Sequence, residues 1–321
     1  MISRADFENY LKSIDTTEYE QKQKKGKRIG NIILYTSVAI IFALVTATVL
    51  LTIETKQTKP GLVSNMLMVT ICVSAILGVV SFSLKVYFSR RGLQKFDDEF
   101  RNKFIEKLFE GYSYTYDRKG VINESIFARS RFSELGDNYE GQDYLSIAIP
   151  NKDGTPSATR LNICDIEISD TNYYTDRNGN MQQETITIYK GAFGYISFAQ
   201  NFKCALGLNS SCGVKGEKRI SLEDVKFNKA IGTFTDNELE ARVILDPVMM
   251  QKLLKLNTYA NGMRIKLNSN EGFLSMRRNL FEARRQKGQT MAEAYASLYD
   301  DAYLIILIVE AIRKEDKKFK I

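Results

Sequence analysis

The sequence contains no histidine among its 321 residues. This absence excludes every catalytic mechanism that needs an imidazole base and every metal site that needs a histidine ligand. Cysteine is also scarce: Cys72 lies in an apolar run, and Cys164, Cys204 and Cys212 lack the paired spacing of a zinc site. We therefore expect no metal and no other cofactor. We expect binding rather than catalysis, although enzymes that use aspartate or lysine escape this argument.

Motifs of common phosphate and calcium sites are missing as well. The sequence has no G-x-x-x-x-G-K-[ST] phosphate loop and no G-x-S-x-G nucleophile turn. Segment 170–184 is rich in Asp and Asn. Aligning Gly179 with the glycine of a calcium loop, however, places Tyr174 and Thr185 where carboxylates are required. The segment is therefore expected to contain a hairpin turn, because an Asn-Gly pair tolerates positive φ.

Two long apolar runs stand out against this background. Residues 29–53 and 61–84 contain no charged side chain and are separated by the short polar link 54–60. Each can form a helix that crosses a hydrocarbon core, which takes about 20 residues. A lone segment in lipid must be helical to satisfy its backbone hydrogen bonds. We predict a transmembrane hairpin over 29–84; the alternative is a pair of core helices in a soluble protein.

Basic residues flank the two runs on one side of the predicted membrane. They are Lys22, Lys24, Lys25, Lys27 and Arg28 before the first run, and Lys85, Arg90, Arg91 and Lys95 after the second. The link carries only two lysines and a glutamate. Because lysine and arginine near spans stay in the cytoplasm, we predict that both termini are cytosolic. The pI near 9.0 then reflects contact with the lipid bilayer, and nucleic acid is not an expected partner.

The chain divides into three predicted parts: a cytosolic helical segment at 1–28, the hairpin at 29–84, and a cytosolic domain at 85–321. A helix at about 86–111 leads the domain. We expect its aromatic stripe to pack on the domain core; the stripe consists of Phe96, Phe100, Phe104, Leu108 and Phe109.

The rest of the domain mixes helical and strand patterns, so the expected fold class is α+β. A short helix capped by Asn123 is predicted at 123–132. Strands are predicted at 143–149, 159–169, 183–190, 192–199 and about 229–235, with a weakly structured loop at 203–218. Helices are predicted at 236–243, after Asp246-Pro247 and at 291–313, and a hairpin is predicted at 263–278.

Four charged residues are candidate contacts for a ligand or partner: Arg129, Arg131, Asp143 and Arg242. Arginine forks bind phosphate or carboxylate groups. Arg129 and Arg131 flank Ser130, but residues at i and i+2 of a helix do not share a face. Pairing with acids nearby in the sequence is therefore the alternative interpretation. No catalytic residue is predicted.

Short motifs in the second half of the chain resemble those of a known family. They are Tyr189-Lys-Gly-Ala-Phe193 leading to Asn201-Phe202, Glu240-Ala-Arg242, Asp246-Pro247 with its following helix, and Asn279-Leu-Phe-Glu282. With the order of parts, they resemble a family of bacterial two-span membrane proteins whose cytosolic α+β domain has no assigned function. The resemblance covers most of the chain. It implies a location in the bacterial cytoplasmic membrane and no catalytic residues.

The sequence thus favours a membrane-anchored cytosolic module for binding or scaffolding, which holds a protein partner at the bilayer. One alternative is an enzyme or a lipid-binding protein at the membrane surface, with a pocket in the α+β domain. Another is a structural component that assembles into homo-oligomers. A concave pocket with converging charges would favour the enzyme over the scaffold.

Overall fold

A computed structural model describes residues 2–55, 60–150, 156–176, 179–198, 201–260, 262–283 and 288–315. These residues form two compact units. The helical unit comprises the described residues of Asn9–Phe104 and Lys287–Glu293. The sheet unit comprises those of Met1–Glu8, Ile105–Gln286 and Ala294–Ile321.

Two long helices, α2 (Thr17–Thr55) and α3 (Pro60–Leu108), supply most of the helical unit. They approach closely at Gly30, where an added Cβ would lie 3.0 Å from the Cα of Lys85. Farther along, the hydroxyl oxygens of Thr48 and Thr70 are 2.9 Å apart, a hydrogen bond between the helices. Small residues that allow close approach and hydroxyls that bond across helices are typical of helix pairs in membranes.

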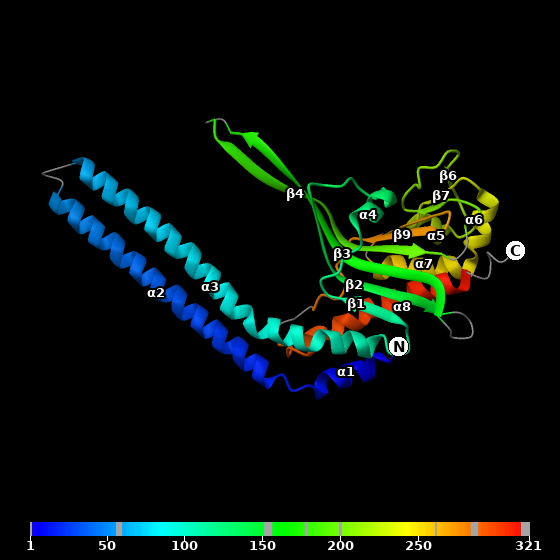
Figure 1. Ribbon diagram of the computed structural model, residues 1–321, viewed down its shortest axis with the longest axis horizontal. Coiled ribbons are helices and arrows are strands. Elements are labelled where there is room, and N and C mark those ends of the chain that lie inside the picture. Colours follow the sequence, from blue (N-terminus) through cyan, green and yellow to red (C-terminus); the bar gives the residue numbers. More distant parts are fainter. Residues whose placement is uncertain are drawn as a thin grey trace. The chain divides into compact units, whose positions relative to one another are not determined.

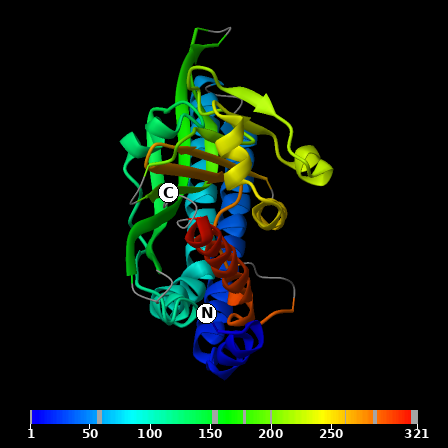
Figure 2. The same ribbon diagram turned by 90° about the vertical axis from the view of Figure 1, so that its right-hand side faces the viewer.

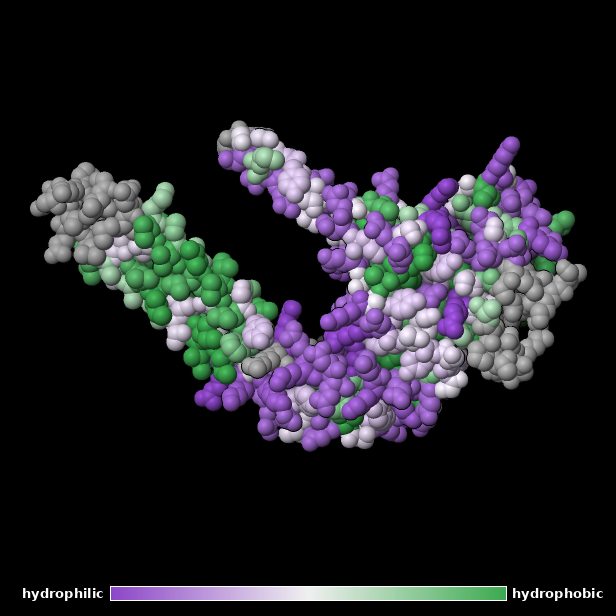
Figure 3. Space-filling model, viewed as in Figure 1, coloured by the Kyte–Doolittle hydropathy of each residue, from purple (hydrophilic) through white to green (hydrophobic). Residues whose placement is uncertain are grey.

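Segments of both helices are long and apolar enough to cross a membrane. These segments are Thr17–Leu50 and Met68–Phe88, and their most apolar 18-residue windows have mean hydropathies of 2.3 and 2.1. Large apolar side chains such as Phe42 and Ile76 are exposed, and Figure 3 shows the apolar surface along α2 and α3. Core helices of a soluble protein would bury such side chains, so this exposure is evidence against the core-helix alternative.

The sheet unit is built on one antiparallel sheet, which has nine strands within the described residues (Figure 1). Their spatial order is β1-β2-β3-β4-β9-β8-β5-β7-β6. The strands are β1 (Tyr114–Asp117), β2 (Asn138–Pro150), β3 (Pro156–Thr175), β4 (Met181–Ser197), β5 (Leu206–Leu208), β6 (Lys218–Ile220), β7 (Thr233–Thr235), β8 (Met263–Asn268) and β9 (Glu271–Met276).

Shorter helices accompany the sheet. They are α4 (Glu124–Ser130), α5 (Val225–Ala230), α6 (Glu238–Ile244), α7 (Pro247–Tyr259), the short 3-10 helix η1 (Glu293–Ala296) and α8 (Ser297–Glu315). Helix α1 (Arg4–Ser13) begins the chain. Helix α8, red in Figure 2, packs against β2 and α7. The N-terminus reaches the same region, since Phe7 is fully buried and its ring lies 6.3 Å from that of Tyr299.

Successive side chains of a strand point to opposite faces of the sheet, and both faces of this sheet carry buried side chains. Cys164, Ile166 and Ile168 of β3 join a cluster with Phe127 of α4. Ile163 and Asp165, at the alternate positions of β3, are buried on the opposite face. Helix α8 contributes the run 303–309, most of which is buried. This run is a core helix of the sheet unit, as its flanking acids and short uncharged length indicate.

The α+β class and the two long apolar helices are confirmed, and the helix predicted at about 86–111 is present as the last part of α3, which ends at Leu108. So are the hairpin of β8 and β9 and the cap of α7, where the Asp246 carboxylate accepts a hydrogen bond from Met249 N at 2.7 Å. Asn123 caps α4 in the same way through Ser125 N at 2.9 Å. These features follow from local chemistry, which the sequence displays directly.

Several strand boundaries predicted above are wrong. The segments 183–190 and 192–197 belong to one strand, β4, because its register with β3 continues through Gly191. The predicted end of the second segment, residue 199, lies outside the described residues. Strand β2 begins at Asn138, earlier than expected, since a bulge near Asp143 breaks its pattern without ending its pairing. The loop at 203–218 contains β5, and the expected strand at 229–235 begins as the end of α5.

The aromatic stripe of α3 does not pack only on the domain core. Phe96 and Phe100 lie 5.3 and 5.8 Å, ring to ring, from Tyr19 of α2. Phe104 packs edge-on against Tyr10 of α1. Farther along, Phe109 contacts aromatic rings of the sheet unit. The stripe is core packing as predicted, but most of it serves the helical unit.

Candidate functional site

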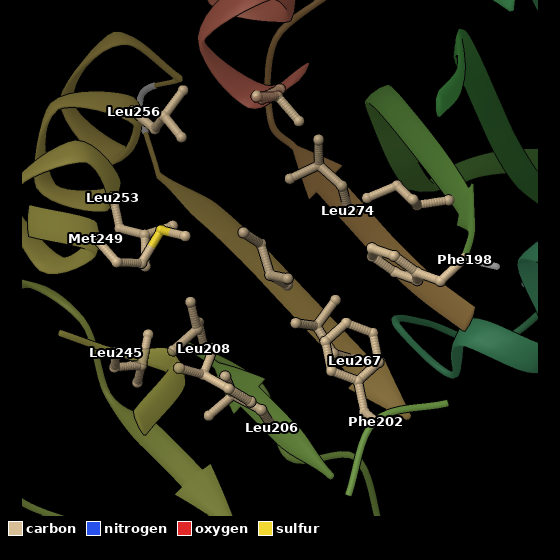
Figure 4. Close-up of a pocket in the computed structure, with 14 residues that line it drawn as sticks. Phe198, Phe202, Leu206, Leu208, Leu245, Met249, Leu253, Leu256, Leu267 and Leu274 are labelled. Carbon is tan, nitrogen blue, oxygen red and sulfur yellow. The ribbon is translucent and has the colours of Figure 1, made fainter. Parts of the chain in front are cut away.

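An apolar cavity of about 70 Å³ lies in the sheet unit beside β5, β8 and β9 (Figure 4). Among the described residues, its lining contains no polar side chain. Strands and their neighbouring segment contribute Ile196, Phe198, Phe202, Leu206, Leu208, Ile265, Leu267 and Leu274, and helices contribute Ile244, Leu245, Met249, Leu253, Leu256 and Ile308.

The cavity forms because strand alternation sends apolar residues of the β8–β9 hairpin to this face. Ile265 and Leu267 of β8 point to the cavity. Arg264 and Lys266, at the alternate positions, donate to the carbonyls of Phe132 and Ser130. Opposite the strands, Met249, Leu253 and Leu256 project from α7, at the helical spacing that places them on one face. The Asp246 cap and Pro247 fix where that helix begins.

The lining has a buried floor and a partly exposed rim. Leu206, Leu208 and Leu274 are at most 2% exposed and form the floor. Phe198 and Phe202 are half-buried, and their rings meet edge to face at 4.6 Å. Both are tied to the β8–β9 turn, where their backbone N–H groups donate to the carbonyls of residues 270 and 269. Two aromatic rings thus form part of the rim.

A lining of this kind favours an apolar ligand over water. Water needs two to four polar partners in a cavity, and this lining offers none. Left empty, a cavity of this volume costs on the order of 2 kcal/mol at roughly 24 cal/mol per Å³. An engineered apolar cavity of about 150 Å³ holds benzene. A site about half that size suits a narrow chain better than a ring.

A second cavity, of about 190 Å³, is polar and contains a buried acid. Asp165 is 5% exposed, and its Oδ1 accepts a hydrogen bond from Leu280 N at 2.8 Å. Its Oδ2 has no hydrogen-bond partner among the described residues. Burial raises the pKa of this carboxyl to about 8, and the nearby carboxylates of Asp143 and Asp301 add to the shift. Asp165 is therefore mainly protonated at neutral pH.

The acids around Asp165 are held by their own partners. The Asp143 carboxylate accepts a hydrogen bond from the Tyr116 hydroxyl, at a left-handed backbone position with φ 58° that belongs to the β2 bulge. Asp301 is fully buried and pairs with Arg278. Lys190, at the cavity wall, pairs with Glu167 at 2.6 Å. No group of three or more potential metal-ligating side chains occurs among the described residues.

The structure places the four sequence-predicted contact residues in separate surroundings. Arg129 pairs with Glu271 at 2.9 Å and lies over the ring of Tyr195. Arg242 pairs with Glu223 and, at 2.7 Å, with Glu238.

Arg131 ends α4 in the left-handed region, with φ 50°, and its carbonyl accepts a hydrogen bond from Lys266 Nζ at 3.0 Å. Asp143 lies in the interior, as described. Within the described residues, Arg129 lies beside Glu271, Arg131 beside Lys266 and Arg242 beside Glu223, so the three arginines have no partner in common. Their role as contacts stays a prediction.

The cavity residues were not singled out from the sequence. Leu206 and Leu208 lie in a segment read as a Gly/Ser-rich loop, although their alternation around Gly207 signals a strand. Asp165 has a clearer signal, since it is the acid inside the run 163–166, whose other residues are apolar. A charged residue in a strand that is otherwise buried on both sides is unusual enough to mark a site.

Comparisons with known proteins give a partial match. Residues 187–314 match the model of a family described as "Protein of unknown function (DUF3137)". This range contains all the short motifs on which the family resemblance rests. No curated protein matches the sequence. Among solved structures, the crystal structure of the mycobacterial trehalose monomycolate transport factor A, TtfA, aligns with a TM-score of 0.34 and 11% identity. The alignment covers 70% of this chain and 96% of that chain.

Proposed function

We propose that the protein is a membrane-anchored binding module whose sheet unit holds the end of a lipid's acyl chain in the apolar cavity. The observation that carries the proposal is the lining itself: of the described residues, fourteen have side chains that line the cavity, and none of these is polar. Apolar area removed from water contributes about 25 cal/mol per Å². The site is therefore expected to bind polymethylene chains, because their burial in it removes apolar area from water.

Two apolar helices support a location in a membrane, where lipid acyl chains are abundant. Thr17–Leu50 and Met68–Phe88 fit a membrane by length and composition, and basic residues flank both on the same side. In this proposal both termini and the sheet unit are cytosolic, and the protein resides in a bacterial cytoplasmic membrane. Lipid chains then reach the cavity from the bilayer that anchors it.

Photo-crosslinking of the full chain in native membranes tests the proposal. Cells are grown with a fatty acid that carries a photoactivatable group, irradiated, and the labelled peptides are identified by mass spectrometry. We expect labels on peptides from 196–208 and 244–256, in addition to labels on the two apolar helices. The helices serve as an internal control, because they contact lipid whether or not the cavity is filled.

A matched pair of variants makes the test specific. The double variant Leu208→Phe with Leu253→Phe narrows the cavity and should lower cavity labelling at least fivefold, while labelling of the apolar helices stays constant. Leu239→Phe makes the same chemical change at an exposed position of α6 and should leave both unchanged. Labels confined to the apolar helices in the unaltered chain would refute lipid binding by the sheet unit.

Protein scaffolding is a second candidate, favoured by the exposed outer part of the β3–β4 hairpin. Tyr173 and Met181 there are 65% and 77% exposed. Aromatic side chains are enriched at the centres of protein interfaces. Crosslinking in native membranes with mass spectrometry of captured proteins separates this role from lipid binding, since only scaffolding requires a reproducible protein partner.

A further inference from the structure

The hairpin of β3 and β4 extends beyond the sheet as a two-stranded ribbon (Figure 1). Strand β2 pairs with β3 no farther than Ser169, and β9 pairs with β4 only from Ala192. Residues 170–175 and 181–186, called the arm, therefore pair only with each other among the described strands. Their register is continuous from Asp170 opposite Ile186 to Thr175 opposite Met181.

The arm keeps a regular shape without the devices that protect strand edges. Isolated two-stranded hairpins are marginally stable in water. Natural edge strands are usually blunted by lysine, proline or a bulge. The arm contains no lysine and no proline, and its register has no bulge. Threonine, tyrosine and isoleucine instead favour extended backbone along both strands.

The outer edge of β3 offers unpaired backbone groups in a fixed pattern. Thr171 N donates to the Asp137 carboxylate at 3.1 Å, which closes the first position of this edge. Backbone groups point to alternate sides along a strand, so those of Tyr173 and Thr175 face the same side as Thr171 N. That side lies past the start of β2, and no described strand pairs with it.

The sequence along this edge is complementary to itself. Residues 171–175 read Thr-Asn-Tyr-Tyr-Thr and carry no charge. Antiparallel pairing of two copies about Tyr173 sets Tyr173 opposite Tyr173 and Thr171 opposite Thr175, and both are favourable cross-strand pairs. Pairing of two β4 strands about Glu184 would instead oppose two carboxylates, which is destabilising.

We propose that the arm pairs with the arm of a second copy, through residues 171–175 of β3 in each chain. The product is a two-fold symmetric, four-stranded ribbon whose two inner strands are both β3. Such a contact is isologous and closes at two copies. Lipid binding by the cavity is not required for it, so the two proposals stand or fall separately.

Disulfide crosslinking of the full chain in native membranes tests the pairing. In a background of Cys72→Ser and Cys212→Ser, Tyr173→Cys places cysteines opposite each other on the two-fold axis. Glu184→Cys is the control, because three strand spacings of about 4.8 Å separate the two copies there. Oxidation should give crosslinked dimers with Tyr173→Cys and at least tenfold fewer with Glu184→Cys. No dimer, or equal yields from the two variants, would overturn the proposal.

Charge variants supply a second, independent readout. Tyr173→Lys opposes two ammonium groups in the paired ribbon, whereas Gln183→Lys adds the same charge to the same face of the arm on strand β4. Energy transfer between copies labelled with two fluorophores should fall at least fivefold in Tyr173→Lys and remain in Gln183→Lys. An equal loss of energy transfer in both variants would mean that the copies associate through the face of the arm rather than through the edge of β3. That result would also overturn the proposal.

Discussion

Asp165 is the residue whose surroundings depart most from what its chemistry prefers. A carboxyl in water ionises near pH 4, but burial among other acids raises the pKa of Asp165 to about 8. One backbone N–H stabilises its Oδ1, while its Oδ2 has no partner among the described residues. Strongly shifted carboxyls in cavities are enriched at functional sites, and structural networks also produce them. Its first measurable consequence is a dependence of stability on pH.

The first prediction concerns that pH dependence. Because the folded-state pKa is raised, the folded protein binds the extra proton between about pH 4 and pH 8, and stability falls as pH rises through this window. Above about pH 8 the folded protein has released this proton, and the stability that the proton contributed is fully lost. Asp165→Asn removes the ionisation, so the slope attributable to this residue, roughly 1.4 kcal/mol per pH unit, should disappear.

The measurement is chemical unfolding of the full chain in detergent between pH 5 and pH 9, followed by tyrosine fluorescence. Asp165→Asn should unfold at higher denaturant concentration than the unaltered chain at pH 9, with the gap closing toward pH 5. Glu167→Gln, two residues along the same strand and partly exposed, is the control and should retain the slope. A parallel pH profile for Asp165→Asn and the unaltered chain would show that Asp165 is ionised in the folded protein.

Single residues also show what a sequence can and cannot predict. The caps at Asn123 and Asp246 were predictable, because an N-cap acts on backbone only two or three residues away. The partners of Arg129 were not, since Glu271 is brought to it by the sheet. The interior position of Asp143 follows from a bulge, and bulges leave little trace in a hydrophobic pattern.

At the level of elements, periodicity predicted the existence of most helices but misjudged the strands. The run 303–309 was identified as a core helix from its bounding acids. The arm, by contrast, was predicted only in part: a strand was expected from 183, and segment 170–184 was expected to contain a hairpin turn, but the pairing of 170–175 with 181–186 was not foreseen. Alternation marks a strand only when one face is buried. Strands 170–175 and 181–186 face solvent on both sides, so pairing alone reveals them.

The second prediction concerns the packing of α2 on α3. Leucine at Gly30 would drive a Cβ against the Lys85 backbone, from which it would lie only 3.0 Å, and should force the helices apart. Gly78→Leu is a matched control, because an added Cβ there meets nothing within 4 Å. Leucine also favours helix over glycine by about 1 kcal/mol, so any loss at position 30 reflects packing.

Hydrogen–deuterium exchange of the full chain in detergent measures this effect. Gly30→Leu should raise exchange of the amides near Tyr19 and Phe96, whose rings lie 5.3 Å apart across the helix pair. Gly78→Leu should leave exchange there unchanged. Increased exchange in both variants would attribute the effect to the added bulk of leucine rather than to the contact at Gly30.

For the molecule as a whole, the sequence predicted the order of parts better than the site. Long apolar runs and flanking charges are one-dimensional signals, and they identified the two apolar helices. The cavity is made by fourteen residues between 196 and 308. Each is an ordinary apolar residue whose role emerges only when strands β5, β8 and β9 meet helices α6, α7 and α8.

The last prediction is the topology. In the proposed arrangement the link 54–60, most of which lies outside the described residues, reaches the far face of the membrane. The sheet unit stays in the cytosol, because the flanking basic residues lie on its side. In a background of Cys72→Ser and Cys212→Ser, Thr58→Cys should react with a membrane-impermeant thiol reagent in intact cells. Leu239→Cys, at a position 79% exposed on α6, should react only after the cells are permeabilised. Labelling of Leu239→Cys in intact cells would show that the sheet unit lies outside the cytosol. The lipid in the cavity could then not come from the cytosolic side of the bilayer.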